Sequence, residues 1–317
     1  MPYEELQSCT ICPRNCGIDR YRNRGYCGAP AELMIDLATL HHGEEPPVSG
    51  SRGSGTIFFS WCNLRCVFCQ NYELSHEGWG SELSTEALAE LMLSLQDKGA
   101  HNINLVTPTH HSLQIISALE LVRQQLRIPI VWNSSAYEKV EILQRLSGLV
   151  DIWLPDYKYS HGIYAKKYSQ AADYPEVAKA ALQEMFRQSG HLQMDAQGMA
   201  VKGMLVRLLV LPHKLAGIND SLRMLADTFG PELYLSLMAQ YYPAGKAQNF
   251  PELNRGISNA EYEEALETAA ELGMNNVFIQ TDTGSKLWTP IFTNNEGQDT
   301  HKPLEIGIHH PHLEQNA

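Results

Sequence analysis

The sequence predicts an α/β fold in which one large unit takes up most of the 317 residues. From residue 55 onward, short apolar segments rich in β-branched and aromatic residues alternate with longer segments whose apolar residues recur at helical spacing. Such alternation is typical of parallel βαβ units. Six or more units in succession favour a full or partial barrel, or a doubly wound sheet.

The expected elements follow one another in a regular order. The first strand spans residues 55–61 and leads into a cysteine-rich loop. A helix follows over residues 84–98, with Ser84 as its N-cap and Gly99 at its end. Further strands are expected at residues 102–106, 129–132, 151–154, 204–211, 233–239 and 276–281. Further helices are expected at residues 112–126, 137–146, 174–189, 220–229 and 260–272, with a hairpin turning at 195–198.

The chain divides into three expected parts. Residues 1–50 form a cysteine-rich N-terminal extension and a loop, residues 51–290 the barrel, and residues 291–317 a C-terminal tail. The boundary near residue 50 lies in a segment dense in Gly, Pro and Ser, which is typical of a loop.

Composition excludes several classes of protein. The net charge is −12, from 36 acidic residues against 24 Lys and Arg. This balance argues against binding to nucleic acid or to an anionic membrane, because both need basic surface. No run approaches the ~18 apolar residues of a membrane span, and the N-terminus lacks the features of a secretory signal. We therefore expect a cytoplasmic protein.

The seven cysteines all lie within the first 69 residues. A disulfide framework prefers an even number and an exported chain, whereas clustered cysteines in the cytosol more often bind metal. The spacing divides them into four and three.

The group of three is Cys62, Cys66 and Cys69, with the spacing C-x3-C-x2-C. It has one ligand fewer than a cysteine-ligated iron–sulfur cluster normally uses, which leaves one position open for chemistry. A structural zinc site completed by His76, or three buried thiols, are the alternatives.

The group of four has the spacing C-x2-C-x3-C-x10-C and consists of Cys9, Cys12, Cys16 and Cys27. Four thiolates suffice for a closed site. One hypothesis is a second 4Fe–4S cluster that relays electrons to the first site. The other is a zinc ion that stabilises a segment too short to have its own core.

Polar residues follow several of the expected strands, where parallel sheets bind their ligands. Arg207 is the exception, because it interrupts an apolar strand. A charged group inside a barrel needs a partner. His110 lies at a strand end and is a further candidate.

The segment FSWCNLRCVFCQN resembles the signature of radical S-adenosylmethionine (SAM) enzymes. A wider stretch, HHGEEPPVSGSRGSGTIFFSWCNLRCVFCQN, is similar to the PflX-like subgroup of the pyruvate formate-lyase activating enzymes. The leading C-x2-C-P-R-x-C, the segment NLVTPTHH and the strand MLVRLLVLP match the same subgroup. The resemblance is close up to residue ~110 and looser beyond it.

The resemblance implies a partial (β/α)6 TIM-like barrel that carries a 4Fe–4S cluster on Cys62, Cys66 and Cys69. It implies that SAM binds to the open iron and is cleaved to a 5′-deoxyadenosyl radical, which takes hydrogen from a substrate. A reductant such as flavodoxin or ferredoxin would supply the electron. The substrate would be a glycine of a glycyl-radical partner protein, with a peptide side chain or a small molecule as the alternative. A non-enzymatic metal-binding or electron-transfer protein is the competing hypothesis.

The resemblance also assigns residues to the SAM site. Asp156 and Lys158 match an Asp-x-Lys motif in which the lysine neutralises the methionine carboxylate. The Gly-Gly-Glu that holds the methionine amino group in activating enzymes is replaced by Thr107-Pro108-Thr109. The implied cofactor-binding residues are Phe68, Thr107, Thr109, Ser134, Asp156 and Lys158.

Overall fold

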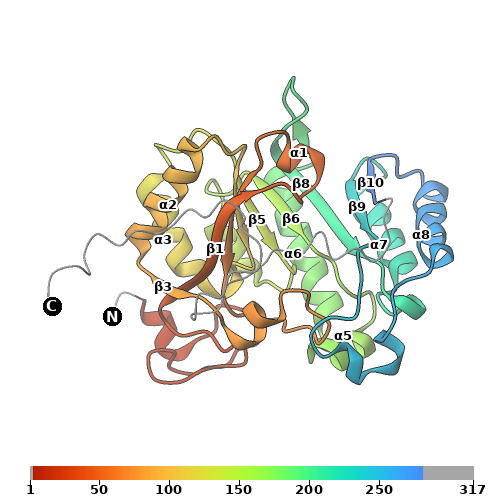
Figure 1. Ribbon diagram of the computed structural model, residues 1–317, viewed down its shortest axis with the longest axis horizontal. Helices are drawn as coiled ribbons and strands as arrows, with labels where there is room; N and C mark the ends of the chain where they lie inside the picture. Colours follow the sequence, from red (N-terminus) through yellow and green to blue (C-terminus); the bar gives the residue numbers. More distant parts are fainter. Residues whose placement is uncertain (1–2, 281–317) are drawn as a thin grey trace, which may run out of the picture.

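The structure is a computed structural model that describes residues 3–280 (Figure 1). The expected tail at residues 291–317 lies outside the described residues, as does the end of the expected barrel segment. Among the described residues, no helix has the length and apolar character needed to cross a membrane.

Ten strands form one open sheet in the described part of the chain, in the order β10-β9-β8-β6-β5-β4-β2-β1-β3, with β7 paired to β8. Their bounds are β1 Leu33–His41, β2 Ser54–Phe59, β3 Ser81–Leu83, β4 Ile103–Val106, β5 Ile130–Ser134, β6 Ile152–Pro155, β7 Gln193–Met194, β8 Ala200–Leu209, β9 Tyr234–Met238 and β10 Val277–Ile279. The seven strands from β10 to β2 along this order run parallel to one another, whereas β1, β3 and β7 pair antiparallel. The sheet confirms the predicted α/β class and its open form, and its seven parallel strands lie at the seven places where strands were expected.

The helices between the strands pack on the outer face of the curved sheet, with α2 and α3 at one end and α7 and α8 at the other (Figure 1). Their bounds are α1 Pro46–Ser49, α2 Thr85–Asp97, α3 Ser112–Val122, α4 Val140–Arg145, α5 Gly162–Ser169, α6 Tyr174–Ser189, α7 Ile218–Phe229 and α8 Asn259–Glu271. Ser84 caps α2 as predicted, since its side chain accepts a hydrogen bond from the amide of Ala87.

Strand β1 was not expected from the sequence, and it determines where the following loop lies. It pairs antiparallel with β2, so that His41 at its end lies opposite Ser54 at the start of β2. Residues 42–53, which we call the floor loop, therefore lie at the amino ends of the parallel strands. The side-chain amide of Asn102, just before β4, fixes this loop by donating to the carbonyl of Val48 at 2.7 Å.

The cysteine-rich N-terminal segment lies at the other end of the sheet from α1 (Figure 1). It shares a small apolar cluster with α3 and α4, formed by Leu6, Cys9, Ile11, Ala31, Leu113 and Ile142. Arg20 is buried there and donates to the carbonyls of Pro30 and His110. The segment is thus held against the barrel by buried contacts rather than by a core of its own.

Candidate active site

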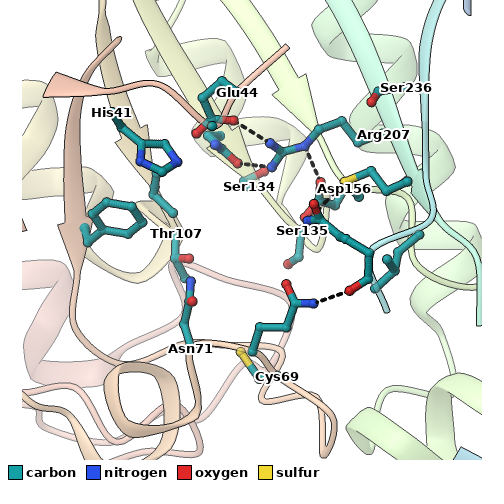
Figure 2. Close-up of a pocket in the computed structure, with 18 of the residues that line it drawn as sticks. His41, Glu44, Cys69, Asn71, Thr107, Ser134, Ser135, Asp156, Arg207 and Ser236 are labelled. Carbon is teal, nitrogen blue, oxygen red and sulfur yellow. Dashed lines mark hydrogen bonds and ion pairs between the residues drawn. The ribbon is translucent and has the colours of Figure 1, made fainter. Parts of the chain in front are cut away.

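A cavity of about 630 Å³ lies inside the curved sheet, between the floor loop and the loop that follows β2. Residues at the carboxyl ends of β4, β5 and β6 and residues of β8 line its sides (Figure 2). The carboxyl edge of a parallel sheet is where such folds bind their ligands.

The thiols of Cys62, Cys66 and Cys69 all line this cavity. Their loop has an unusual backbone, because Trp61 and Arg65 adopt φ values of 72° and 54°, a region that non-glycine residues seldom occupy. Such strain is often found at functional sites.

The buried neighbours of the loop keep it in this conformation. Asn63 is fully buried, and its amide donates to the carbonyl of Tyr137 at 2.8 Å. Leu64 is fully buried beside it. The conformation of the loop is thus fixed by packing against the barrel.

Burial sets the protonation of these thiols. It raises the pKa of Cys62 and raises that of Cys69 to about 12. In the metal-free chain both are therefore protonated at neutral pH. A bound metal stabilises the thiolate form, so metal binding at this loop would release protons.

Aromatic and hydroxyl groups surround the same loop. Phe68 lines the cavity and meets Tyr159 and Tyr241 edge to face, at ring distances of 6.2 and 5.9 Å. The hydroxyl of Ser169 donates to the sulfur of Cys66 at 3.1 Å. Fully buried side chains of the barrel therefore pack behind Phe68 and Cys66.

Four of the other sequence-predicted residues, Thr107, Ser134, Asp156 and Lys158, line this cavity. The ammonium of Lys158 donates to a carboxylate oxygen of Asp156 at 2.9 Å. Burial lowers the pKa of Lys158, but Asp156 and the Cys66 sulfur outweigh this effect and the net shift is upward. The structure therefore provides a partly buried cation in the cavity that the three thiols line.

Thr109 is not brought into the cavity. It begins a short 3-10 turn, and its hydroxyl donates to Oε1 of Glu138 at 2.9 Å in the interior. Thr107 differs because it lines the cavity and adopts a φ of 60°, a region that favours glycine.

Arg207 has the partners that a charge inside a barrel requires. Its guanidinium lies 2.6 Å from Oδ1 of Asp156 and 2.8 Å from Oε2 of Glu44, and it also donates to Asn133 (Figure 2). Burial lowers the pKa of Arg207, but the two carboxylates outweigh this and raise it. One network of ion pairs and hydrogen bonds therefore joins β8, β5, the end of β6 and the floor loop.

Sequence analysis missed Glu44 and Glu45 as functional residues. Both line the cavity; Glu45 is buried, and the side chain of Glu44 is 8% exposed. Oε2 of Glu45 has no hydrogen-bond partner within residues 3–280. Burial raises the pKa of both, although Arg207 opposes the shift. The signal available in the sequence was Arg207 itself, because a lone buried cation predicts an anion elsewhere in the chain.

The four N-terminal cysteines surround a different, much smaller cavity of about 10 Å³ together with Arg14, Arg20 and His110. The sequence-based division into four and three is thus a division in space. All seven cysteines are unpaired, and within the described residues no three His, Cys, Asp or Glu side chains have the spacing of a site for a single metal ion. A cluster needs a wider arrangement, because each thiolate binds its own iron.

His76 does not line the large cavity. Its ring stacks on Tyr72 and its Nδ1 lies 2.8 Å from the hydroxyl of Ser75. Burial lowers its pKa to about 4. The structure therefore does not bring His76 beside the three cysteines as a fourth zinc ligand would require.

Comparisons with known proteins show what parts of the chain resemble. Residues 56–186 match the model of the radical SAM superfamily. The chain is 28% identical over 282 residues to the uncharacterized protein MJ0674 of Methanocaldococcus jannaschii. The alignment covers 86% of this chain and 77% of that protein.

Two solved structures are also similar. Methylornithine synthase (PylB) has a TM-score of 0.47 at 12% identity, over 77% of this chain and 75% of its own. HydG, a maturase of the [FeFe]-hydrogenase, has a TM-score of 0.47 at 14% identity, over 69% of this chain and 48% of its own.

The matched segment includes the loop with Cys62, Cys66 and Cys69 and the carboxyl ends of β4, β5 and β6. This part of the chain is therefore similar to radical SAM enzymes, which use a 4Fe–4S cluster, SAM and a reductant. The three thiols and the partly buried ammonium of Lys158 fit this pair of cofactors, since thiolates bind iron and a cation suits a carboxylate.

Proposed function

We propose that the chain binds a 4Fe–4S cluster through Cys62, Cys66 and Cys69, binds SAM beside it, and removes a hydrogen atom from a glycine of a partner protein. One observation carries the proposal: the three thiols and the Lys158–Asp156 pair line a single cavity. When bound and given one electron, these cofactors supply a 5′-deoxyadenosyl radical.

The chain's own residues would then bind and orient SAM and keep water out of the cavity. Lys158 would neutralise the methionine carboxylate, while Asp156 keeps its ammonium in place. The hydroxyls of Thr107 and Ser134 would hydrogen-bond to polar groups of SAM from the adjacent strand ends. Phe68 and its aromatic neighbours would keep water from the radical.

A peptide backbone as substrate is supported by the amide groups of the cavity. Gln70, Asn71 and Gln240 line it, and Gln70 donates to the carbonyl of Gln240 at 3.0 Å (Figure 2). Side-chain amides both donate and accept, as binding of an extended peptide group requires. The resemblance of the sequence to activating enzymes favours a glycine as the reacting residue.

The test has two stages. The anaerobically purified protein is reconstituted with iron and sulfide, reduced with dithionite or reduced flavodoxin, and assayed for 5′-deoxyadenosine. A glycyl-radical enzyme deuterated at glycine is then added, and deuterium in the product is measured. Deuterium transfer and a glycyl-radical signal support the proposal.

The other results separate the competing hypotheses. 5′-Deoxyadenosine without deuterium would leave the radical chemistry standing and refute the glycine substrate, which would favour a peptide side chain or a small molecule. No 5′-deoxyadenosine from a protein with an intact cluster would refute the enzymatic function.

A further inference from the structure

The four N-terminal cysteines form a second site that the large cavity does not include. Cys9, Cys12 and Cys27 are buried, and all four cysteines line the same small cavity. Backbone amides already point at two of the sulfurs: Tyr26 donates to Cys16 at 3.5 Å and Ala29 to Cys27 at 3.4 Å. Amide donors to sulfur are typical of thiolate-bound metal sites, because they stabilise the negative charge.

The charge around this cavity also favours thiolates. The side chains of Arg14 and Arg20 line it, and Arg20 is 3% exposed. Burial raises the pKa of Cys12 to about 12 and also raises that of Cys27. Two guanidinium groups would offset part of the charge of four thiolates around a metal.

Arg14 connects this segment to the loop of Cys62, Cys66 and Cys69. Its Nε donates to the carbonyl of Asn63 at 2.8 Å and its Nη2 to the carbonyl of Leu64 at 3.2 Å. Its guanidinium also lies over the ring of Tyr26, 3.7 Å from the centroid. Two residues of the three-cysteine loop are thus held by a side chain that lines the four-cysteine cavity.

Two further contacts join the same segments. Arg65 donates to the carbonyl of Cys27 at 3.3 Å. Gly28 packs so closely on Trp61 that a Cβ atom there would lie 2.3 Å from the indole ring. The positive φ of 86° at Gly28 adds to the need for glycine. The chain next to Cys27 and the chain next to Cys62 therefore support each other.

His110 also connects the two cysteine segments. It lines the four-cysteine cavity, and its Nε2 lies 2.7 Å from the carbonyl of Ser60, two residues before Cys62. A carbonyl only accepts, so Nε2 carries the proton. The other ring nitrogen, Nδ1, is buried and has no hydrogen-bond partner among residues 3–280.

We propose that Cys9, Cys12, Cys16 and Cys27 hold a closed four-thiolate metal centre, and that its occupancy rigidifies the three-cysteine loop through Arg14, Arg65 and Gly28. The centre holds either an iron–sulfur cluster or a zinc ion, since both bind four thiolates. Within the described residues the sulfurs lack the spacing of a single-ion site, so a zinc ion would require them to move, whereas in a cluster each thiolate binds its own iron. This centre has no open position, so SAM does not bind to it.

The principal experiment uses full-length protein with Cys62, Cys66 and Cys69 changed to Ala, which leaves only the four-cysteine site. Samples are reconstituted anaerobically with iron and sulfide or with zinc, and iron, sulfide and zinc are quantified. A variant that also carries Cys9→Ser and Cys12→Ser is the comparison. We expect one centre per chain in the first variant and its loss in the second.

The form of the centre follows from the same samples. About four irons per chain with matching sulfide indicate a cluster, and one zinc retained against iron indicates a zinc site; either result supports the proposal. An electron paramagnetic resonance (EPR) spectrum of the reduced cluster that stays unchanged on adding SAM supports its closed coordination. Equal metal content in the two variants would refute a metal centre on the four N-terminal cysteines.

Hydrogen exchange tests the coupling without any need for activity. In the variant that keeps the four cysteines, metal binding should slow exchange of the amides at residues 61–69. Arg14→Gln should abolish this slowing while metal content stays the same. Arg22→Gln is the matched control, because Arg22 is exposed in the same segment and pairs with Asp19. Unchanged exchange on metal binding, in a protein with full metal content, would overturn the coupling.

Discussion

Glu44 and Arg207 form an ion pair across the interior of the barrel, with Oε2 and Nη1 2.8 Å apart although the two residues are 163 positions apart in the sequence. Glu44 comes from the floor loop at the amino ends of the strands, while Arg207 projects from β8. Nη2 and Nε of the same guanidinium bind Asn133 and Asp156. One side chain therefore connects the floor of the cavity to the strand ends that carry Lys158.

Removal of the Arg207 guanidinium should destabilise the folded protein. Arg207→Leu leaves two carboxylates in an interior where the side chains of Arg207 and Glu44 are only 12% and 8% exposed. Breaking a buried ion pair from one side costs about 3–5 kcal/mol. We expect a loss of that order in the free energy of unfolding, measured by urea denaturation. Glu44→Gln should lower the free energy of unfolding by less, because the amide oxygen still accepts a hydrogen bond from Arg207. Equal losses in Arg207→Leu and Glu44→Gln would contradict this explanation, which rests on unpaired charge.

Thr109 should affect stability and leave SAM binding unchanged. Thr109→Val removes the donor to Glu138 and leaves a buried carboxyl with one partner fewer, which costs about 1–3 kcal/mol. Calorimetry or urea denaturation measures this loss. The dissociation constant of SAM in the reconstituted variant should match that of the wild type, and a clear rise would place Thr109 at the cofactor after all.

Glu138 should give the protein a pH-dependent stability. Burial raises its pKa above the ordinary value of about 4.5. A raised folded-state pKa means that the stabilising contribution is complete below that ordinary value and is lost as the pH rises through the folded-state pKa. Glu138→Gln should flatten this decline when unfolding is measured from pH 4 upward. A decline of the same slope in the variant would assign it to other groups.

Lys158→Ala should weaken SAM binding. A hydrogen bond to a charged group contributes about 1.5–3 kcal/mol, which corresponds to roughly a ten- to hundredfold rise in the dissociation constant. Binding to the reconstituted protein is measured by equilibrium dialysis. Lys158→Arg is the control, because it keeps the positive charge near Asp156 and should retain more affinity. Equal binding by Lys158→Ala and the wild type would refute the carboxylate role.

Local patterns in the sequence predicted the alternating strands and helices well. Ser84 caps its helix, and Arg207 has the partners that its burial required. Strand β1 and the position of Glu44 could not be predicted in this way, because they depend on pairing between segments remote from each other. Asp36 also interrupts the apolar alternation of β1.

Thr107 and Thr109 show the same limit of sequence-based prediction within one short motif. Thr107 and Thr109 stand two residues apart, and an extended strand would point both to the same face. The positive φ of Thr107 and the 3-10 turn after it send only Thr107 into the cavity. A departure from regular backbone of this kind has no signature in residue spacing.

The most direct test of the account is EPR spectroscopy of the reduced cluster in a variant with Cys9, Cys12, Cys16 and Cys27 changed to Ser, with and without SAM. The account predicts a 4Fe–4S signal from Cys62, Cys66 and Cys69 that shifts when SAM is added, together with formation of 5′-deoxyadenosine. A reconstituted cluster whose spectrum is unchanged by SAM, with no 5′-deoxyadenosine formed, would contradict it.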